Sequence, residues 1–231
     1  MRVPASFVAL LAMPLAAEAA RPFVTDDARL TTAQSCQLET WVRSYPDSRE
    51  TWVLPACNPT GNLEFTVGGG VARDPGGAST RDYIVQLKTL FRPLETNGWG
   101  WGLGVGRVFH PEVNPGPNLL GNTYAYLPFS ASFADNRVVL HGNLGALRDR
   151  ATRGHRKTWG VGGEFEITPR ASAIAESFGD DRAHPYWQVG GRLAVVPGQV
   201  QIDATVGQQF SGPRNGRWIS IGLRLTPDRL F

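Results

Sequence analysis

Apolar and polar residues alternate along most of this chain with the two-residue period of β-strands. The stretch GWGWGLGVGRVFH, from Gly98 to His110, places large apolar residues at odd positions from Trp99 to Val105 and glycine at the even ones. Successive side chains of a strand point to opposite faces of a sheet, so this stretch presents one apolar face and one bare face. The alternation recurs between turn residues and predicts about twelve strands and no helix.

The predicted strands begin with a hairpin that turns at Tyr45–Ser48, and ten more strands follow. We expect them at about 62–72, 81–91, 98–109, 123–133, 138–147, 158–167, 172–178, 186–196, 200–208 and 217–225.

The hairpin has a register that can be derived from the sequence. Pairing Cys36 with Cys57 also places Trp41 opposite Trp52 and Arg43 opposite Glu50. A disulfide, an aromatic pair and an ion pair are the cross-strand contacts that stabilise antiparallel strands. We therefore predict a Cys36–Cys57 disulfide, which is consistent with an exported protein.

The two faces of the predicted sheet differ in polarity throughout the chain. One face carries residues such as Phe65, Leu87, Phe129, Val161 and Ile221, whereas the opposite face is polar. A transmembrane β-barrel directs its apolar face toward lipid and its polar face toward the lumen. The sequence thus predicts an all-β, outer-membrane type antiparallel barrel. The residues expected to line its lumen and solute pathway are Glu64, Gln86, Lys88, His141, Asn143, Glu164, Glu166, Glu176, Gln188, Arg192, Asp203 and Arg224.

Connection lengths and the N-terminus indicate how the barrel is placed. Connections after even strands are mostly short and those after odd strands are mostly longer, which in outer-membrane barrels marks the short rim as periplasmic. Residues 1–19 have the charge, apolar run and A-x-A site of a signal peptide. We expect residues 20–34 to form a periplasmic lead-in and 35–231 the barrel, in the outer membrane of a Gram-negative envelope. The C-terminal Phe231 fits recognition by the barrel assembly machinery.

Short turns suggest three side-chain clusters in the lumen. One is an Arg192–Asp203–Arg224 row, for which we favour a structural role over a solute-binding ring. Another is Glu164 opposite Glu176, which would bind a cation or be neutralised by basic residues from across the lumen. The last places Ser130 or Ser132 opposite His141 beside Asn143, similar to the Ser-His-Asn site of outer-membrane phospholipases. These residues face the lumen near the periplasmic rim, whereas a lipid hydrolase needs a nucleophile that faces lipid, so hydrogen bonding is favoured.

Charge adds two expectations about partners. The formal net charge of +3 is too small to indicate nucleic-acid binding. Five basic residues cluster at the long-loop rim, where they would either attract lipopolysaccharide or be solvated; they are Arg148, Arg150, Arg153, Arg156 and Lys157. The sequence indicates no cofactor and no metal site.

The segments ARPFVTDDARLTTAQSCQLETWV and ACNPTGNLE resemble a family of uncharacterised bacterial outer-membrane barrels. Members are described as transporters or as acting in a meta-pathway of phenol degradation. The resemblance implies fold and location and transfers no site residue. We expect a narrow channel or uptake route for small solutes, apolar or aromatic ones among them. The alternatives are a plugged barrel with a structural or envelope-interaction role, and a lipid-modifying enzyme.

The glycine column of the opening stretch carries one further expectation. A run of lumen-facing glycines reserves space for something that approaches closely. We expect Arg192 or Arg224 from the opposite wall, or the N-terminal lead-in, to occupy it.

Overall fold

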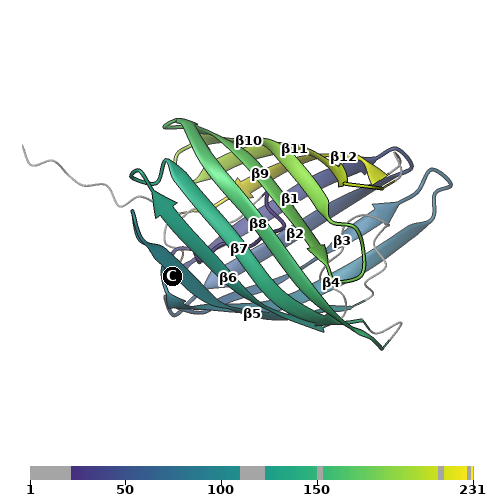
Figure 1. Cartoon of the computed structure of the whole chain (residues 1–231), viewed down its shortest axis with the longest axis horizontal. Coiled ribbons are helices and arrows are strands. Elements are labelled where there is room, and N and C mark those ends of the chain that lie inside the picture. The colour runs from purple at the N-terminus through teal and green to yellow at the C-terminus, as the bar shows by residue number, and fades with distance from the viewer. Residues whose placement is uncertain (1–21, 110–122, 150–152, 213–215, 228–229, 231) are drawn as a thin grey trace, which may run out of the picture.

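Twelve antiparallel strands form a closed barrel in the computed structural model, as the alternation predicts (Figure 1). The structure describes residues 22–109, 123–149, 153–212, 216–227 and 230. The expected signal peptide and Phe231 lie outside them. The strands are β1 (Ser35–Tyr45), β2 (Ser48–Asn58), β3 (Glu64–Arg73), β4 (Ser79–Arg92), β5 (Trp99–Phe109), β6 (Thr123–Phe133), β7 (Val138–Arg148), β8 (His155–Thr168), β9 (Ala171–Asp180), β10 (Tyr186–Val196), β11 (Val200–Gln209) and β12 (Trp218–Leu225).

Each strand pairs with its neighbours in the sequence, and β1 closes the barrel against β12. The first hairpin has the predicted register, with Cys36 opposite Cys57 and joined to it by a disulfide. Trp41 and Trp52 stack with ring centroids 5.7 Å apart. Among the described residues, no helix is long and apolar enough to span a bilayer.

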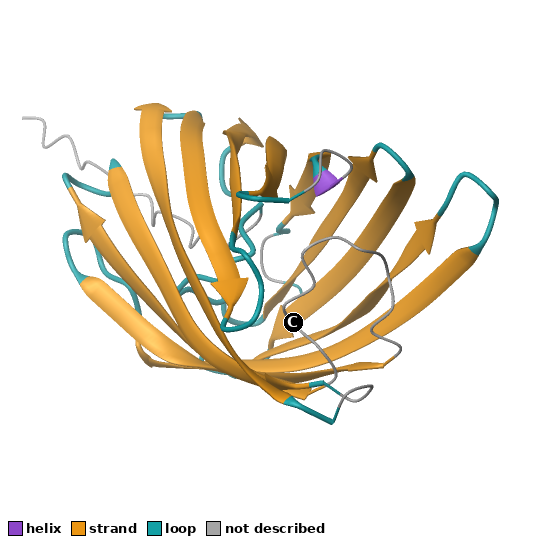
Figure 2. Ribbon diagram, turned by 45° about the vertical axis from the view of Figure 1, so that its right-hand side comes forward, coloured by secondary structure: helices purple, strands orange, loops and turns teal. Residues whose placement is uncertain are grey.

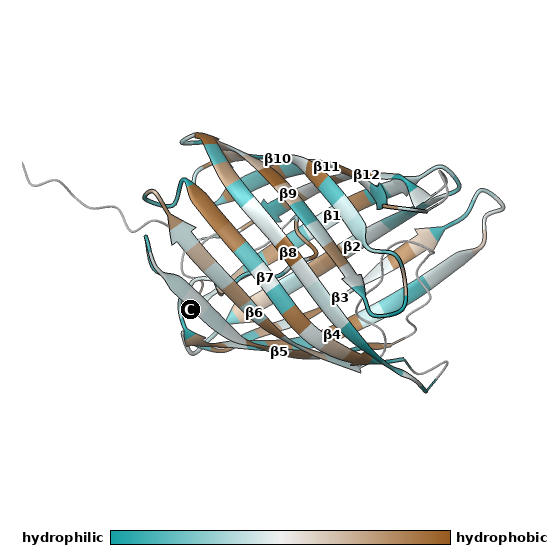
Figure 3. Cartoon of the chain, in the orientation of Figure 1, coloured by the Kyte–Doolittle hydropathy of each residue, from teal (hydrophilic) through white to brown (hydrophobic). Residues whose placement is uncertain are grey.

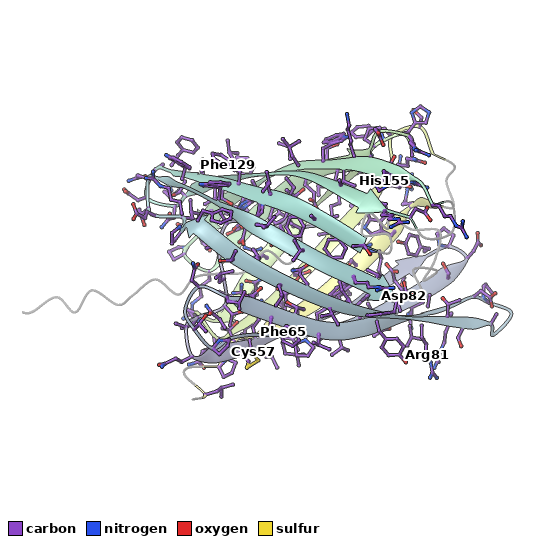
Figure 4. The ribbon with its side chains drawn as sticks, turned by 90° about the horizontal axis from the view of Figure 1, so that it is seen from below. Cys57, Phe65, Arg81, Asp82, Phe129 and His155 are labelled. Atoms are coloured by element: carbon purple, nitrogen blue, oxygen red, sulfur yellow. A yellow bond between two sulfur atoms is a disulfide. The ribbon has the colours of Figure 1, made fainter. Side chains whose placement is uncertain are left out.

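The outside of the barrel is apolar and the inside is polar. Phe65 and Phe129 project outward with 44% and 45% of their surface exposed, whereas lumen-facing Lys88 and Arg192 are buried. The alternation of the two classes along each strand is visible in Figure 3. Figure 4 shows the same inversion in side chains, with Phe65 and Phe129 on the outer surface. Since burial of apolar area drives folding in water, an exterior of this kind needs an apolar solvent.

Two apolar clusters pack inside the barrel near the long-loop end. Ile84, Val108, Tyr124 and Leu147 form one cluster over β4 to β7. Tyr45, Phe178 and Trp218 form the other, over β1, β9 and β12. Between these clusters and the short-turn end, the interior carries many polar side chains and a small apolar cluster of Ala28, Leu30 and Leu90, and chain that precedes β1 occupies it.

The lumen face of β5 is covered by its neighbour β6. A Cβ atom at Gly104 would overlap the ring of Tyr126, and one at Gly106 would overlap Tyr124. The two tyrosine rings stack on each other, with centroids 6.1 Å apart. The expectation that Arg192, Arg224 or the lead-in would fill this space is therefore wrong, because an aromatic side chain on the adjacent strand is nearer than anything across the lumen.

Candidate functional site in the barrel lumen

Residues 22–34 pass through the interior of the barrel before β1 begins. Loop segments inside the ring of strands are visible in Figure 2. We call residues 22–34 the lumen segment; its residues Phe23, Thr25, Asp27, Ala28 and Thr31 are buried. The sequence suggested a periplasmic lead-in here, but its hydrogen bonds are made to lumen-facing side chains of the strands.

Side chains of the wall bind the backbone of the lumen segment. Glu176 accepts hydrogen bonds from the N–H groups of Val24 and Thr25, at 2.7 and 2.8 Å. Glu64 accepts one from the N–H of Thr31 at 2.6 Å. A buried backbone donor without an acceptor costs free energy, so these carboxylates satisfy a segment that has no strand partner.

Amides and hydroxyls of the wall complete this set of contacts. Asn143 accepts from the Asp26 N–H and donates to the Asp26 carbonyl, both at 2.7 Å. Ser130 accepts from the N–H of Ala28 at 2.9 Å, and Gln188 donates to the carbonyl of Pro22 at 3.0 Å. The segment thus contacts walls from β3 to β10.

Ion pairs anchor the turn at Asp26 and Asp27. The ammonium group of buried Lys88 lies 2.8 Å from Asp26 and 3.5 Å from Asp27. Tyr126 donates to the second oxygen of Asp26 at 2.5 Å. No partner for Asp26 or Asp27 was predicted from the sequence. Lys88 is the one lysine of β4 and lies on its polar face, so a carboxylate partner for it could have been inferred from the sequence.

Glu164 is the centre of a second charged cluster. One carboxylate oxygen accepts from Arg192 at 2.7 Å, and the other lies 3.0 Å from Nε2 of His141 and 3.4 Å from Arg29 of the lumen segment. The sequence favoured neutralisation of the acidic cluster by Lys88, Arg192 or Arg224 from across the lumen. Arg192 does bind Glu164, but it lies on β10, only two strands from β8. Within the described residues, no group of three or more His, Cys, Asp or Glu could hold a metal ion.

Ser130, His141 and Glu164 form a hydrogen-bonded chain at the place where the sequence suggested a Ser-His-Asn site. Ser130 lies opposite His141, as the register predicted, with its Oγ 2.8 Å from Nδ1. Phe23 packs against the imidazole at a centroid distance of 5.3 Å, and Ser130 is fully buried. The Ser130 hydroxyl accepts the N–H of Ala28 and has no exposed surface, so in this structure it holds the lumen segment.

Two predicted registers are wrong by two residues. Glu176 lies opposite Gly162, not opposite Glu164, because Thr168 pairs with Ala171 across the turn and a bulge between Glu166 and Thr168 shifts the pairing by one more residue. Arg192 does lie opposite Asp203, but Arg224 pairs with Gln201 and with Glu39 instead of Asp203. The longer connection between β11 and β12 changes that pairing.

Most residues expected in the lumen are buried there, and one is at its mouth. Glu64, Lys88, His141, Glu164, Glu176, Gln188, Arg192, Asp203 and Arg224 are buried, and Gln86 and Asn143 are half-buried. Gln86 accepts from Tyr124 at 2.8 Å. Glu166 is exposed near the short turn after β8.

Glycines on β8 make room for the lumen segment. This clearance was not predicted from the sequence. A Cβ atom at Gly160 would overlap Thr25, and one at Gly162 would lie against Phe23 and Glu176. The glycine clearance for this segment is thus on β8, not on β5.

Comparisons with known proteins agree with this architecture. A family model described as Uncharacterised conserved protein UCP029691 matches residues 7–226. No curated protein matches the chain. The KdgM porin superposes with a TM-score of 0.62 at 9% identity, covering 83% of this chain and 99% of the porin. The NanC porin gives 0.57 at 9%, covering 83% and 98%. The COG4313 outer membrane channel from Pseudomonas putida F1 gives 0.54 at 11%, covering 86% and 97%.

Proposed function

Because this chain belongs to the family of uncharacterised conserved proteins UCP029691 and has the fold of the KdgM and NanC porins, we propose that it is an outer-membrane channel for small solutes. Its lumen is closed at rest by residues 22–34. The apolar exterior supports a position in the membrane, and the short turns support an orientation with their rim toward the periplasm.

The observation that carries this proposal is the way the lumen segment is held. Its anchors are hydrogen bonds and ion pairs to Glu64, Lys88, Asn143, Glu164 and Glu176, whose groups would bind water or a polar solute equally well. A polar lumen that keeps its charges satisfied with or without the segment can exist in two states.

The lumen also suggests what passes through it. Aromatic residues of the two apolar clusters, Tyr45, Tyr124, Phe178 and Trp218, line the interior near the long-loop end, and polar groups follow below. A small solute with one apolar and one polar part would fit the aromatic region and the polar region below it.

Conductance in planar bilayers tests the proposal. The mature chain, which begins at residue 20, is compared with a variant that lacks residues 20–33. We expect brief or rare openings from the full chain and sustained conductance from the deletion variant. A deletion variant that shows the heat-modifiable gel migration of a folded barrel but remains silent would contradict the channel.

The plugged structural barrel is the second candidate, and one observation favours it. Lumen-facing Gln201, Thr205, Ser220 and Arg224 on β11 and β12 are buried, and Gln201 and Arg224 lie opposite each other on the two strands. If these side chains close the lumen without the segment, the deletion variant stays silent.

A further inference from the structure

Basic side chains lie in a row on the outer surface of the barrel near its long-loop end. Register places Arg107 beside Thr123, Thr123 beside Arg148, and Arg148 beside His155, each pair on adjacent strands. Lys157 is the next residue of β8 after His155 on the same face, and it lies opposite Ala146. All of these side chains are exposed on the face that carries the apolar belt. In Figure 4, His155 lies at the opposite end of the barrel from Phe65 and Phe129.

The row borders a groove in the apolar exterior. The groove has a volume of about 670 Å³ and lies between β4 and β8. Ala125 and Ala146 form its floor, since their small side chains leave a depression among larger neighbours. Leu87 and Val105 line one side. This volume lies within the range of small-molecule sites, about 300–1,000 Å³.

The cations of this row are not neutralised by nearby acids among the described residues. Asp149 and Asp180 bind Arg156, at 3.2 and 3.1 Å. Asp181 accepts from the backbone N–H of Lys157 at 3.1 Å. Arg107 lies over the ring of Phe109, 5.0 Å from its centroid, which keeps its guanidinium near the edge of the groove.

We infer that Arg107, Arg148, His155 and Lys157, with the groove floored by Ala125 and Ala146, bind a phosphorylated glycolipid of the outer leaflet. Its phosphate lies against the cations and an acyl chain lies in the groove. Adjacent strands are about 4.8 Å apart, so the row from Arg107 to His155 extends about 14 Å. Such a row can contact more than one phosphate of a single headgroup, and a basic cluster above an apolar surface is complementary to an anionic lipid.

The inference rests on the membrane placement proposed above, but it does not depend on conductance. A silent barrel can still bind lipid at its outer wall, and an open one can lack the site. The two proposals therefore fail in different experiments.

Binding is measured on the full mature protein refolded in detergent, by titration with bisphosphorylated lipid A and with the same lipid after removal of its phosphates. We expect the phosphorylated form to bind more tightly. Arg107→Gln with Arg148→Gln should weaken that binding by roughly fivefold for each cation removed and leave binding of the dephosphorylated form unchanged. The matched control is Arg137→Gln with Arg170→Gln, which removes the same charge at the short-turn rim.

A second variant tests the groove. Ala146→Phe fills the floor from the exposed side, so the barrel interior is not disturbed, and it should weaken binding of both lipid forms. Heat-modifiable migration shows that each variant has folded. Equal affinity of the wild type for the two lipid forms would overturn the inference, as would equal losses in the Arg107/Arg148 and Arg137/Arg170 variants. So would an Ala146→Phe variant with wild-type affinity.

Discussion

Lys88 anchors the lumen segment through its charge. Its ammonium group is buried and faces two carboxylates, Asp26 and Asp27, that belong to a segment with no strand partner. Removing one partner of a buried ion pair leaves an uncompensated charge, which costs more than the pair contributes when intact.

Lys88→Met should therefore detach the lumen segment or destabilise the barrel. The expected loss is about 3–5 kcal/mol if the carboxylates stay buried, and less if the segment leaves and they reach water. Urea unfolding in detergent and channel conductance distinguish these outcomes. Lys88→Arg keeps the charge and is the control. Adding Asp26→Asn to Lys88→Met should recover part of the loss; no difference between the Met and Arg variants would contradict the role of the pair.

Gly160 gives a second test at the residue scale, because Thr25 fits against position 160 only when no side chain is present there. Gly160→Ala should displace Thr25 and lower the unfolding free energy by about 1–3 kcal/mol, the usual cost of overpacking. It should also raise the frequency of channel openings. Gly142→Ala on the adjacent strand is the control, since a Cβ there meets only the Gly160 carbonyl at 3.9 Å. Equal effects of both substitutions would show that Gly160 makes no specific clearance.

At the scale of strands and hairpins, the register could be predicted from the sequence where the connection between two strands is short. The pairing of Cys36 with Cys57, of Ser130 with His141 and of Arg192 with Asp203 follows from alternation across short turns. The pairings of Glu176 and Arg224 were missed, because a bulge or a long loop shifts register by amounts that polarity does not encode. A shift of two residues keeps every side chain on its face, so the alternation looks the same in both registers.

The first hairpin should remain formed without its disulfide. Cys36→Ala with Cys57→Ala is expected to lower stability by at most about 2–4 kcal/mol, since the bond closes a sequence separation of 21 residues that the strands also hold. Trp41 against Trp52 and Arg43 against Glu50, 3.3 Å apart, preserve the register. Urea unfolding with and without reductant checks this. Reductant should shift the wild-type curve and not that of the variant, and a variant that fails to show heat-modifiable migration would show that the bond is needed for closure.

At the scale of the whole molecule, the sequence named the N-terminal lead-in as one possible occupant of the lumen, but the wall residues that bind it could not be predicted. Residues 22–34 show no period, and their contacts join positions far apart in the chain, such as Thr25 and Glu176, 151 residues apart. Alternation identifies a face and a polarity but not which segment lies against that face. The polar lumen was thus predicted, whereas its occupation by residues 22–34 is a property of the assembled barrel.

Charge selectivity of the opened barrel follows from the same contacts. The wall groups that bind the lumen segment include the carboxylates of Glu64, Glu164 and Glu176 and the ammonium of Lys88. Arg192 neutralises Glu164, so the exposed path carries excess negative charge and should prefer cations. The reversal potential of the variant lacking residues 20–33 in a potassium chloride gradient measures this preference. Glu64→Gln with Glu176→Gln should reduce it or reverse it, whereas Glu166→Gln at the mouth should change it less. Anion preference in the deletion variant would show that solutes pass along the wall that carries Arg43 and Arg224 instead.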